Sequence, residues 1–511
     1  MLKPSRNLIL ILVLWLITRV VFYSIYHTYV VYDEIGYMYS SQHLLELKEG
    51  VTQGPMIYLL TWPLFKAGFS YSVAKLPFIF VDLAILLSVY FICKRKSEKI
   101  AIYASLFYLI SPMNLRDSYH VHTDMIALLS FLLAGYFFAR YHAESSNKYL
   151  IYSAILATIS GLTKEIIFCF YIVLILYLLI QHYFIKKVDR RIVISTLALI
   201  VVSNIAIQLI NNFLWVKNSH RAVLGFILDI FRSGNTLSNG IIWIVLIYFL
   251  FLNPVSAVFG MGSLKRFIAR VWKKKAVVDW WSNYQLISLL SFSVIALFFA
   301  AYILVPLFVA YLAPFYAIYA AEGFQKYGKK ITALLIGFAV CFAIVVEYEQ
   351  DAASINNLAK VLDDIPSSTI YADTQHDFIR AVLNFKVKNK TLKSITLEEL
   401  PLLAKEQTIY VFTSGKDHEE AFDTMLDKTG TPHVKIKVYV STMERYVYGI
   451  GQDIHLAQPK RQYESLFMQP IRTSLEEKLF NYLISLKRRY CADPWLGKDK
   501  YYNYVCLWAK L

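Results

Sequence analysis

The chain has 511 residues, of which 57% are apolar, and its mean hydropathy is +0.47. That apolar share is above the range of soluble globular proteins. It is concentrated between Leu8 and Val346 in runs of about 20 residues, the length that spans a bilayer. The formal net charge of +16 does not indicate a nucleic-acid partner, because the basic residues of this region gather in alternate loops, the positive-inside pattern of membrane proteins.

This pattern predicts an α-helical polytopic membrane protein, with about 11 transmembrane helices over residues 1–348 and a small C-terminal α/β soluble domain over residues 349–511. The expected spans lie near residues 8–29, 72–93, 99–115, 122–142, 148–163, 166–185, 192–213, 240–260, 284–304, 305–322 and 330–348. The first run is longer than the apolar core of a signal peptide, carries Arg19 and lacks a small-residue cleavage site, which indicates an uncleaved helix. The N-terminus is then cytoplasmic, and an odd number of spans places the C-terminal domain outside.

The stretch near residues 34–70 is only partly apolar and contains Gly54, Pro55 and Pro63, which predicts short helices along the outer interface. Arg19 is expected to face the interior of the helix bundle, since charges are costly in lipid. The basic clusters of the membrane domain are expected in cytoplasmic loops: Lys94–Lys96, Lys186–Arg191, Lys265–Lys275 and Lys326–Lys330.

The C-terminal part alternates strand-like and helical patterns. Ser368–Thr374, Thr408–Thr413 and Val434–Val440 are expected to be strands of the small α/β domain. Cys491 and Cys506 both fall in this external domain, where an oxidising compartment allows them to pair, so we expect a disulfide between them.

Ionisable residues gather at helix ends on the predicted outer face. They are Asp33 with Glu34, the stretch from Arg116 to Asp124, and Lys164 with Glu165. Three separate segments thus deliver charge to one side of the membrane, where it must face water, other charges or a ligand. This convergence is the main functional signal of the sequence.

Asp33 and Glu34 directly follow the first span. Taken alone, adjacent carboxylates at the water boundary are most simply a helix end. In the functional interpretation they are the catalytic carboxylates, one of them a general base within reach of an acceptor hydroxyl.

Asp117, His120 and Asp124 share one face if their segment is helical. Carboxylate and imidazole at this spacing suit a divalent metal, which is the only cofactor that the sequence leaves open. Polar loops carry such groups often, and a hydrogen-bonded support for the site or for a lipid phosphate is favoured over metal binding.

Lys164 closes the predicted fifth span between apolar residues. The ordinary interpretation is a lysine that snorkels to the interface, paired with Glu165. The functional interpretation is a point-charge ligand for phosphate, with Arg116 as a second one. A lipid-phosphate leaving group needs a cation to stabilise its developing charge more than it needs a proton donor.

The order of these motifs resembles the GT-C membrane glycosyltransferases, in the branch of protein O-mannosyltransferases and bacterial lipid A aminoarabinose transferases. The residues that carry the resemblance are the Asp33–Glu34 pair after the first span, the Arg116–Asp124 loop, the Leu162–Thr163–Lys164 motif, and residues 310–324, which resemble a late pattern usually written R-Y-L-L-P. Two positions depart from the family. Ala310 stands where the late pattern has Arg, and Tyr119 stands where the loop commonly has Arg, which leaves Arg116 or His120 as substitutes.

The resemblance implies an inverting glycosyltransferase. Asp33 would deprotonate or orient the acceptor hydroxyl, and the polyprenyl phosphate would leave toward Lys164, helped by Arg116. The expected partners are a dolichyl- or undecaprenyl-phosphate-linked sugar, membrane lipid and a protein, lipid or glycan acceptor, in a plasma membrane or endoplasmic reticulum. The sugar and the acceptor stay open.

Two other functions compete with this one. A transporter or lipid flippase would place its polar sites near the bilayer midplane, in repeated halves, and no repeat is evident here. A non-catalytic protein that binds a lipid-linked sugar is kept open by Ala310.

Overall fold

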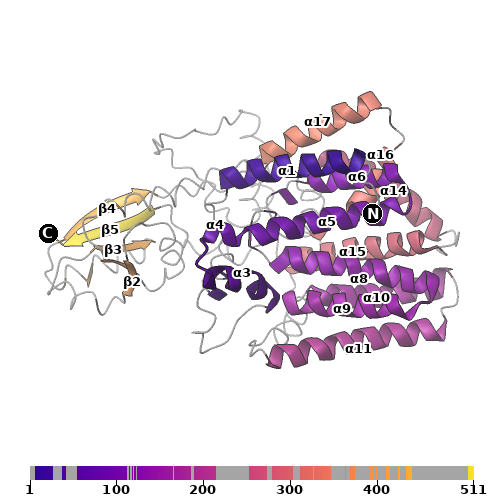
Figure 1. Cartoon of the computed structure of the whole chain (residues 1–511), viewed down its shortest axis with the longest axis horizontal. Helices are drawn as coiled ribbons and strands as arrows, with labels where there is room; N and C mark the ends of the chain where they lie inside the picture. Colours follow the sequence, from indigo (N-terminus) through magenta and orange to yellow (C-terminus); the bar gives the residue numbers. More distant parts are fainter. Residues whose placement is uncertain are drawn as a thin grey trace. The chain divides into compact units, whose positions relative to one another are not determined.

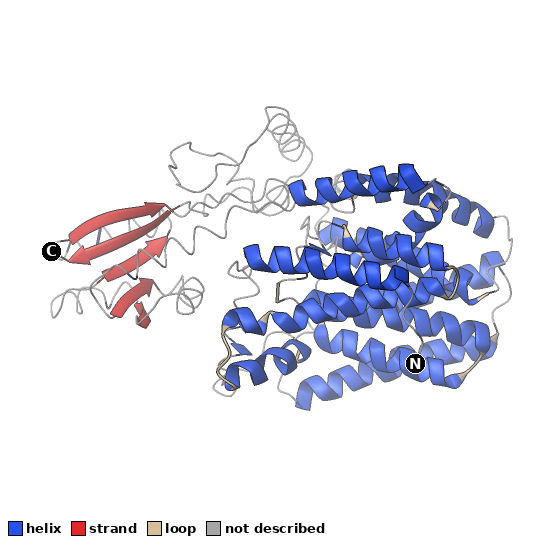
Figure 2. Cartoon of the chain, turned by 45° about the horizontal axis from the view of Figure 1, so that its top comes forward, coloured by secondary structure: helices blue, strands red, loops and turns tan. Residues whose placement is uncertain are grey.

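The computed structural model of the chain comprises two compact units. One contains Met1–His27 and Ser40–Glu347, and the other contains Thr28–Tyr39 and Tyr348–Leu511. The structure describes residues 6–26, 37–38, 40–41, 54–111, 114–115, 118, 120–121, 123–164, 166–185, 189–213, 253–272, 279–302, 311–325, 327, 329–346, 363, 369–373, 391–395, 399, 410–414, 424–425, 428, 433–439 and 504–510. Figure 2 shows helices in the first unit and strands in the second.

The first unit is a bundle of helices that run alongside one another (Figure 1). Its elements are α1 (Arg6–Tyr26), α3 (Met56–Lys66), α4 (Tyr71–Ala74), α5 (Leu76–Lys94), α6 (Glu98–Leu109), α8 (Thr123–Glu144), α9 (Asn147–Thr163), α10 (Ile167–Ile180), the π-helix η1 (Gln181–Ile185), α11 (Arg190–Phe213), α14 (Pro254–Trp272), α15 (Trp280–Tyr302), α16 (Ala313–Phe324) and α17 (Lys329–Val346).

Helix α8 lies in the middle of the bundle and α11 at its edge. Most of α8 is buried against α5, α9 and α15, whereas α11 packs mainly on α9 and exposes a row of apolar side chains. Large apolar residues are exposed on other helices too, including Leu10, Phe80 and Leu334. In a bilayer these side chains contact lipid rather than water, so their exposure carries no cost there.

Three helical segments of the described part are long and apolar enough to cross a bilayer: Ser72–Lys94, Thr123–Glu144 and Arg190–Asn212. Ile167–Tyr183 and Lys330–Cys341 are shorter apolar helices. These segments indicate an integral membrane protein, while the count of about 11 spans and the outward position of the C-terminal part stay predictions. In the stretch near residues 34–70 the structure has the short helix α3, which contains Pro63, while its position along the outer interface stays a prediction.

The loop expected at Lys265–Lys275 is helical in its first part. Lys265, Arg266 and Arg270 lie within α14, which continues to Trp272, and not in a loop. The helix extends because it is amphipathic there: Phe267 is buried and its ring packs edge-on against Tyr319 of α16, while the basic side chains are exposed.

Helices α14 and α16 pack so closely that two of their glycines leave no room for a side chain. A Cβ atom at Gly260 would lie 2.1 Å from Tyr316 Cζ, and one at Gly323 would lie 2.2 Å from the carbonyl oxygen of Phe259. Small residues at helix crossings allow this spacing in membrane bundles.

The start of α15 is set by Asp279, whose carboxylate accepts a hydrogen bond from the Ser282 backbone N–H at 2.9 Å. Partial burial raises the pKa of Asp279, but the hydrogen bonds from Ser282 and the charge of Lys96 outweigh this effect and leave the pKa below its usual value.

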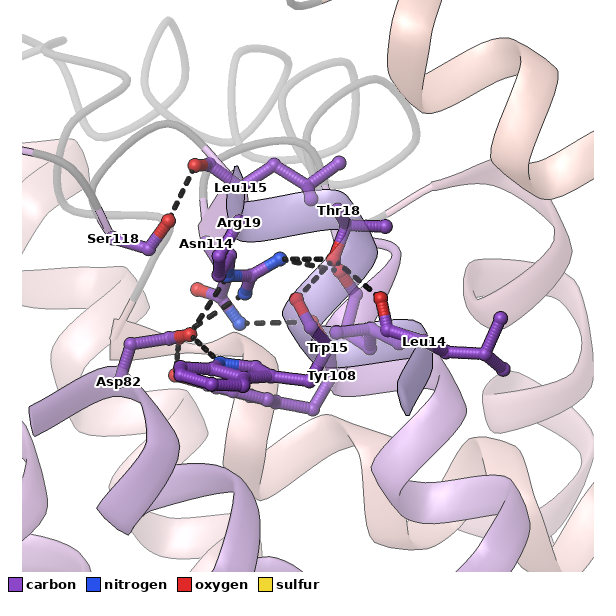
Figure 3. Close-up of polar contacts among 10 residues, drawn as sticks. Leu14, Trp15, Thr18, Arg19, Asp82, Tyr108, Asn114, Leu115 and Ser118 are labelled. Carbon is purple, nitrogen blue, oxygen red and sulfur yellow. Dashed lines mark hydrogen bonds and ion pairs between the residues drawn. The ribbon is translucent and has the colours of Figure 1, made fainter. Parts of the chain in front are cut away.

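A buried ion pair joins α1 to α5 (Figure 3). The Arg19 guanidinium donates to both carboxylate oxygens of Asp82, from Nε at 2.8 Å and from Nη2 at 3.2 Å. Trp15 Nε1 and the Tyr108 hydroxyl complete the shell of Asp82 at 2.7 and 2.8 Å. The side chains of Arg19 and Asp82 are 2% and 0% exposed, so both charges rely on each other rather than on water. Arg19 thus faces the bundle interior, as expected.

The second unit contains a five-stranded mixed sheet in the order β2-β1-β3-β5-β4. The strands are β1 (Thr369–Asp373), β2 (Thr391–Ile395), β3 (Tyr410–Ser414), β4 (His433–Tyr439) and β5 (Tyr504–Lys510). β1 is parallel to β2 and β3, whereas β5 is antiparallel to β3 and β4. The three predicted strands are present as β1, β3 and β4, and the sequence pattern missed β2 and β5. The segments between the strands lie almost entirely outside the described residues, so the α/β assignment stays a prediction.

Replacing Asp82 by Asn should lower the free energy of unfolding by about 3–5 kcal/mol, because the Arg19 charge stays buried without its counter-charge. Unfolding of the detergent-purified protein, followed by circular dichroism, measures the change. Lys94→Ala is the control, since its pair with Glu98 is solvent-exposed and contributes at most about 1 kcal/mol. Equal losses in the two variants would contradict a special role for the buried pair.

Candidate functional site

Three helix ends meet at the carboxylate of Asp124. Lys164 Nζ and the Tyr311 hydroxyl both lie 2.5 Å from the same oxygen, Asp124 Oδ1. Asp124 is in the first turn of α8, Lys164 is the residue after α9, and Tyr311 lies two residues before the start of α16. The residues are separated by 40 and 187 positions in the sequence, so only the packing of the helices brings them together. We call these three residues the Asp124 cluster.

The local sequence explains where each group stands. Asp124 lies at the positive end of α8, where a carboxylate is favoured. Lys164 leaves the helix with an extended backbone, φ −158° and ψ 155°, while its N–H still donates to the carbonyl of Ser160 at 2.9 Å. The backbone of Lys164, from which its side chain extends, is therefore still held by a hydrogen bond to α9.

The cluster is mostly shielded from solvent. The side chains of Lys164 and Asp124 are 19% and 9% exposed, and Tyr311 is buried. Burial strengthens the attraction between the ammonium and the carboxylate, and it makes the loss of either partner costly. The lysine keeps the larger exposed share, so it is the charge of this pair that an incoming anion would meet.

The described residues of the loop before Asp124 form short turns. The N–H groups of Asn114 and Leu115 donate to the carbonyl of Ser111, and the N–H of Ser118 donates to the carbonyl of Asn114. Asn114 Nδ2 also donates to the carbonyl of Tyr108, whose hydroxyl binds Asp82 (Figure 3). The loop is thereby connected to the Arg19–Asp82 pair.

His120 is buried, but α8 begins only at Thr123. The helical face expected for His120 and Asp124 is therefore not formed. Among the described residues no three His, Cys, Asp or Glu side chains are grouped as a metal site. Asp124 Oδ1 already accepts from a cationic ammonium, which disfavours a metal cation at that same oxygen.

The remaining predicted site residues lie outside the described part of the chain. They are Asp33, Glu34, Arg116, Asp117 and Cys491, together with Glu165 and Ala310. Cys506 is in β5, where it is paired in register with Thr413 and Lys437, and its disulfide with Cys491 stays a prediction.

Two residues were missed from the sequence. Tyr311 follows Ala310 in the late motif, but only Ala310 was selected from the sequence, as the position where the pattern has Arg. Asp82 is the only acidic residue between Leu76 and Lys94, and a single carboxylate in an apolar span is a signal that we could have used.

Comparison with known proteins supports the resemblance to membrane glycosyltransferases. The family model described as dolichyl-phosphate-mannose-protein mannosyltransferase matches residues 52–207, less than half of the chain, and this segment contains Asp124 and Lys164. A comparison with curated proteins gives no match.

Among solved structures, ArnT from Cupriavidus metallidurans bound to undecaprenyl phosphate is similar, with a TM-score of 0.52 and 12% identity over 85% of this chain and 95% of that one. The apo form of that protein gives a TM-score of 0.49, 12% identity and coverage of 84% and 96%. The oligosaccharyltransferase of Archaeoglobus fulgidus in the apo form gives a TM-score of 0.48, 14% identity and coverage of 89% and 72%. The first of these likenesses shows a shared fold. The family-model match and this fold confirm the resemblance that the sequence predicts, to the GT-C superfamily of membrane glycosyltransferases.

Proposed function

We propose that the chain transfers a sugar, with inversion, from a polyprenyl-phosphate donor to an acceptor at the outer face of the membrane. The Asp124 cluster is the observation that carries this proposal. A lysine with limited exposure, oriented by a carboxylate at the meeting point of three helices, is suited to receive an anionic lipid headgroup.

Lys164 binds the donor phosphate in this proposal. The ammonium is held near Asp124 before the donor arrives, so little side-chain freedom is lost on binding. The phosphate then competes with the carboxylate for the lysine N–H groups. The Tyr311 hydroxyl also donates to Asp124 and keeps the carboxylate satisfied while the lysine turns to the donor.

The reaction exchanges one bond to the anomeric carbon for another. The acceptor oxygen attacks that carbon, its proton passes to Asp33, and the bond from carbon to phosphate oxygen breaks with its electron pair. The leaving polyprenyl phosphate gains negative charge, which Lys164 and Arg116 stabilise. Asp33 and Arg116 enter through the sequence pattern alone.

The donor class is supported by the relatives. The matched family is named for dolichyl-phosphate mannose, and ArnT is described bound to undecaprenyl phosphate. Both are polyprenyl phosphates, so the carrier chemistry is common to them, while the sugar differs between members of the superfamily. Protein, lipid and glycan acceptors all fit the proposal.

The position of the cluster favours a transferase over a transporter. Asp124, Lys164 and Tyr311 all stand at the ends of helices. Transporters bind their substrates near the middle of broken helices, about halfway through the bilayer.

Asp33→Asn should abolish sugar transfer and leave donor binding unchanged, because the amide cannot accept the acceptor proton. We expect the rate to fall by about 10²–10⁴-fold. The assay uses purified protein, a panel of radiolabelled polyprenyl-phosphate sugars and a membrane extract as acceptor. Asp189→Asn is the control, since Asp189 only caps α11 and Asn caps equally well. Retained transfer in Asp33→Asn would remove the base from the mechanism.

Lys164→Met should weaken binding of undecaprenyl phosphate by about 10- to 100-fold, the worth of a charge-assisted contact. Lys164→Arg should keep more binding than Lys164→Met, because it retains the charge. Binding of the labelled lipid to the detergent-solubilised protein measures both. Equal affinity of Lys164→Met and the wild type would overturn the phosphate role.

Asp124→Asn should destabilise the protein more than the double variant Asp124→Asn/Lys164→Met, because the single change leaves the ammonium without its counter-charge. A coupling of about 1–3 kcal/mol is expected from the unfolding free energies of the four proteins in the cycle. Additive effects would show that the contact between the two side chains carries no energy.

A further inference from the structure

The start of α3 lies against the backbone of the residues that end at Lys164. A Cβ atom at Gly54 would lie 1.9 Å from the carbonyl oxygen of Leu162 and 2.8 Å from that of Thr163. Gly54 does not have a positive φ, so the position requires glycine for space and not for backbone conformation. The contacted atoms are backbone, which cannot rotate away as a side chain can.

Gly54 is itself firmly held. Pro55 follows it as the N-cap of α3, and its carbonyl accepts from the N–H groups of Tyr58 and Leu59 at 3.2 and 3.3 Å. The buried face of α3 includes Ile57 and Thr61, and the Thr61 hydroxyl lies 2.6 Å from that of Ser41. An added methyl group at Gly54 would therefore push on α9 rather than displace α3 freely.

On the other side of the contact, Lys164 is the next residue after Thr163. Its N–H is the last hydrogen bond of α9, to Ser160. A displacement of the Leu162 and Thr163 carbonyls is passed through one peptide unit to the Cα atom of Lys164. The ammonium would then move relative to Asp124, which is positioned separately by α8.

Gly161 offers a matched comparison in the same helix turn. The atoms nearest to a Cβ atom there belong to side chains: Ile207 Cδ1 on α11 at 2.2 Å and Ile167 Cγ2 on α10 at 3.2 Å. The end of the Ile207 side chain can rotate away. Both glycines are crowded, but an added Cβ atom at Gly54 would meet backbone atoms, whereas the nearest atoms at Gly161 belong to side chains.

We propose that Gly54 is a positioning residue for Lys164: the start of α3 sets the place of the lysine ammonium by backbone contact with the end of α9. This inference rests on the proposed function, in which Lys164 binds the donor phosphate. It gives the segment that contains Gly54 and α3 a role in donor binding.

The test is a double-mutant cycle of Gly54→Ala and Lys164→Met in the full chain, with labelled undecaprenyl phosphate as the probe. Gly54→Ala alone should weaken binding by about 10-fold, since displacing a ligating group by about 1 Å has effects of this size or larger. In the Lys164→Met background the same change should alter binding by less than about two-fold, because the group it displaces is gone. The KM for the acceptor should stay unchanged in Gly54→Ala.

Gly161→Ala is the steric control. It should lower the unfolding temperature and leave the affinity for the probe within about three-fold of the wild type. Should Gly54→Ala not fold, Pro55→Ala takes its place. It adds no atom at the contact but frees the backbone that holds Gly54, and it should weaken binding by about two- to five-fold with the same cancellation.

The outcomes separate the two proposals. If Lys164→Met binds the probe as the wild type does, the phosphate role and the inference both fail. If Lys164→Met weakens binding but the effect of Gly54→Ala is undiminished in that background, only the inference fails, because Gly54 then acts without the lysine. A Gly161→Ala variant that weakens binding and cancels in the same way would also overturn it.

Discussion

A single carboxylate oxygen, Asp124 Oδ1, connects three helices of the described bundle. It accepts from the ammonium of Lys164 and from the hydroxyl of Tyr311, so it joins the first turn of α8, the end of α9 and the approach to α16. In a region with little water this contact lowers the cost of keeping a lysine charged, and it leaves the lysine at the edge of the cluster. The proposed recognition of phosphate rests on that arrangement more than on any one residue.

The cluster depends on rigid surroundings. The Arg19–Asp82 pair ties α1 to α5, and Tyr108 and Asn114 extend it to the loop before Asp124. Helices α14 and α16 are joined both by close packing at Gly260 and Gly323 and by a hydrogen bond from Ser263 to Glu322. Polar contacts and small residues are the two means by which helices associate where burial of apolar surface gives no advantage.

These features give the bundle two kinds of surface. Its periphery, as on α11, exposes apolar side chains suited to lipid, whereas one end of α8 and α9 carries a charged group with limited access to water. A donor with an isoprenoid tail and a phosphate headgroup has the same two parts. The proposed function therefore matches the chemistry of the surface as well as the resemblance to GT-C glycosyltransferases.

The sequence by itself determined the class of protein and the positions of most helices. Apolar runs of bilayer length and alternating charge predict helices at α1, α5, α8, α9 and α11, because hydrophobicity and helical hydrogen bonding act locally along the chain. The same local reasoning placed β1, β3 and β4 but missed β2 and β5. Those two strands are recognised only through their partners in the sheet.

The sequence predicted two residues of the site but not the contacts that they make. Asp124 and Lys164 could be selected as charges at the ends of spans, yet nothing in the sequence pairs them with each other or with Tyr311. A shared helical face for His120 and Asp124 was conditional on a helix that includes both, and α8 begins only at Thr123. Pairing between residues 40 or 187 positions apart is decided by how the helices pack, since a hydrogen bond depends on distance in space and not on distance along the chain. For the same reason Gly54 was visible as a helix-breaking residue, while its contact with the backbone before Lys164 was decided by the tertiary structure alone.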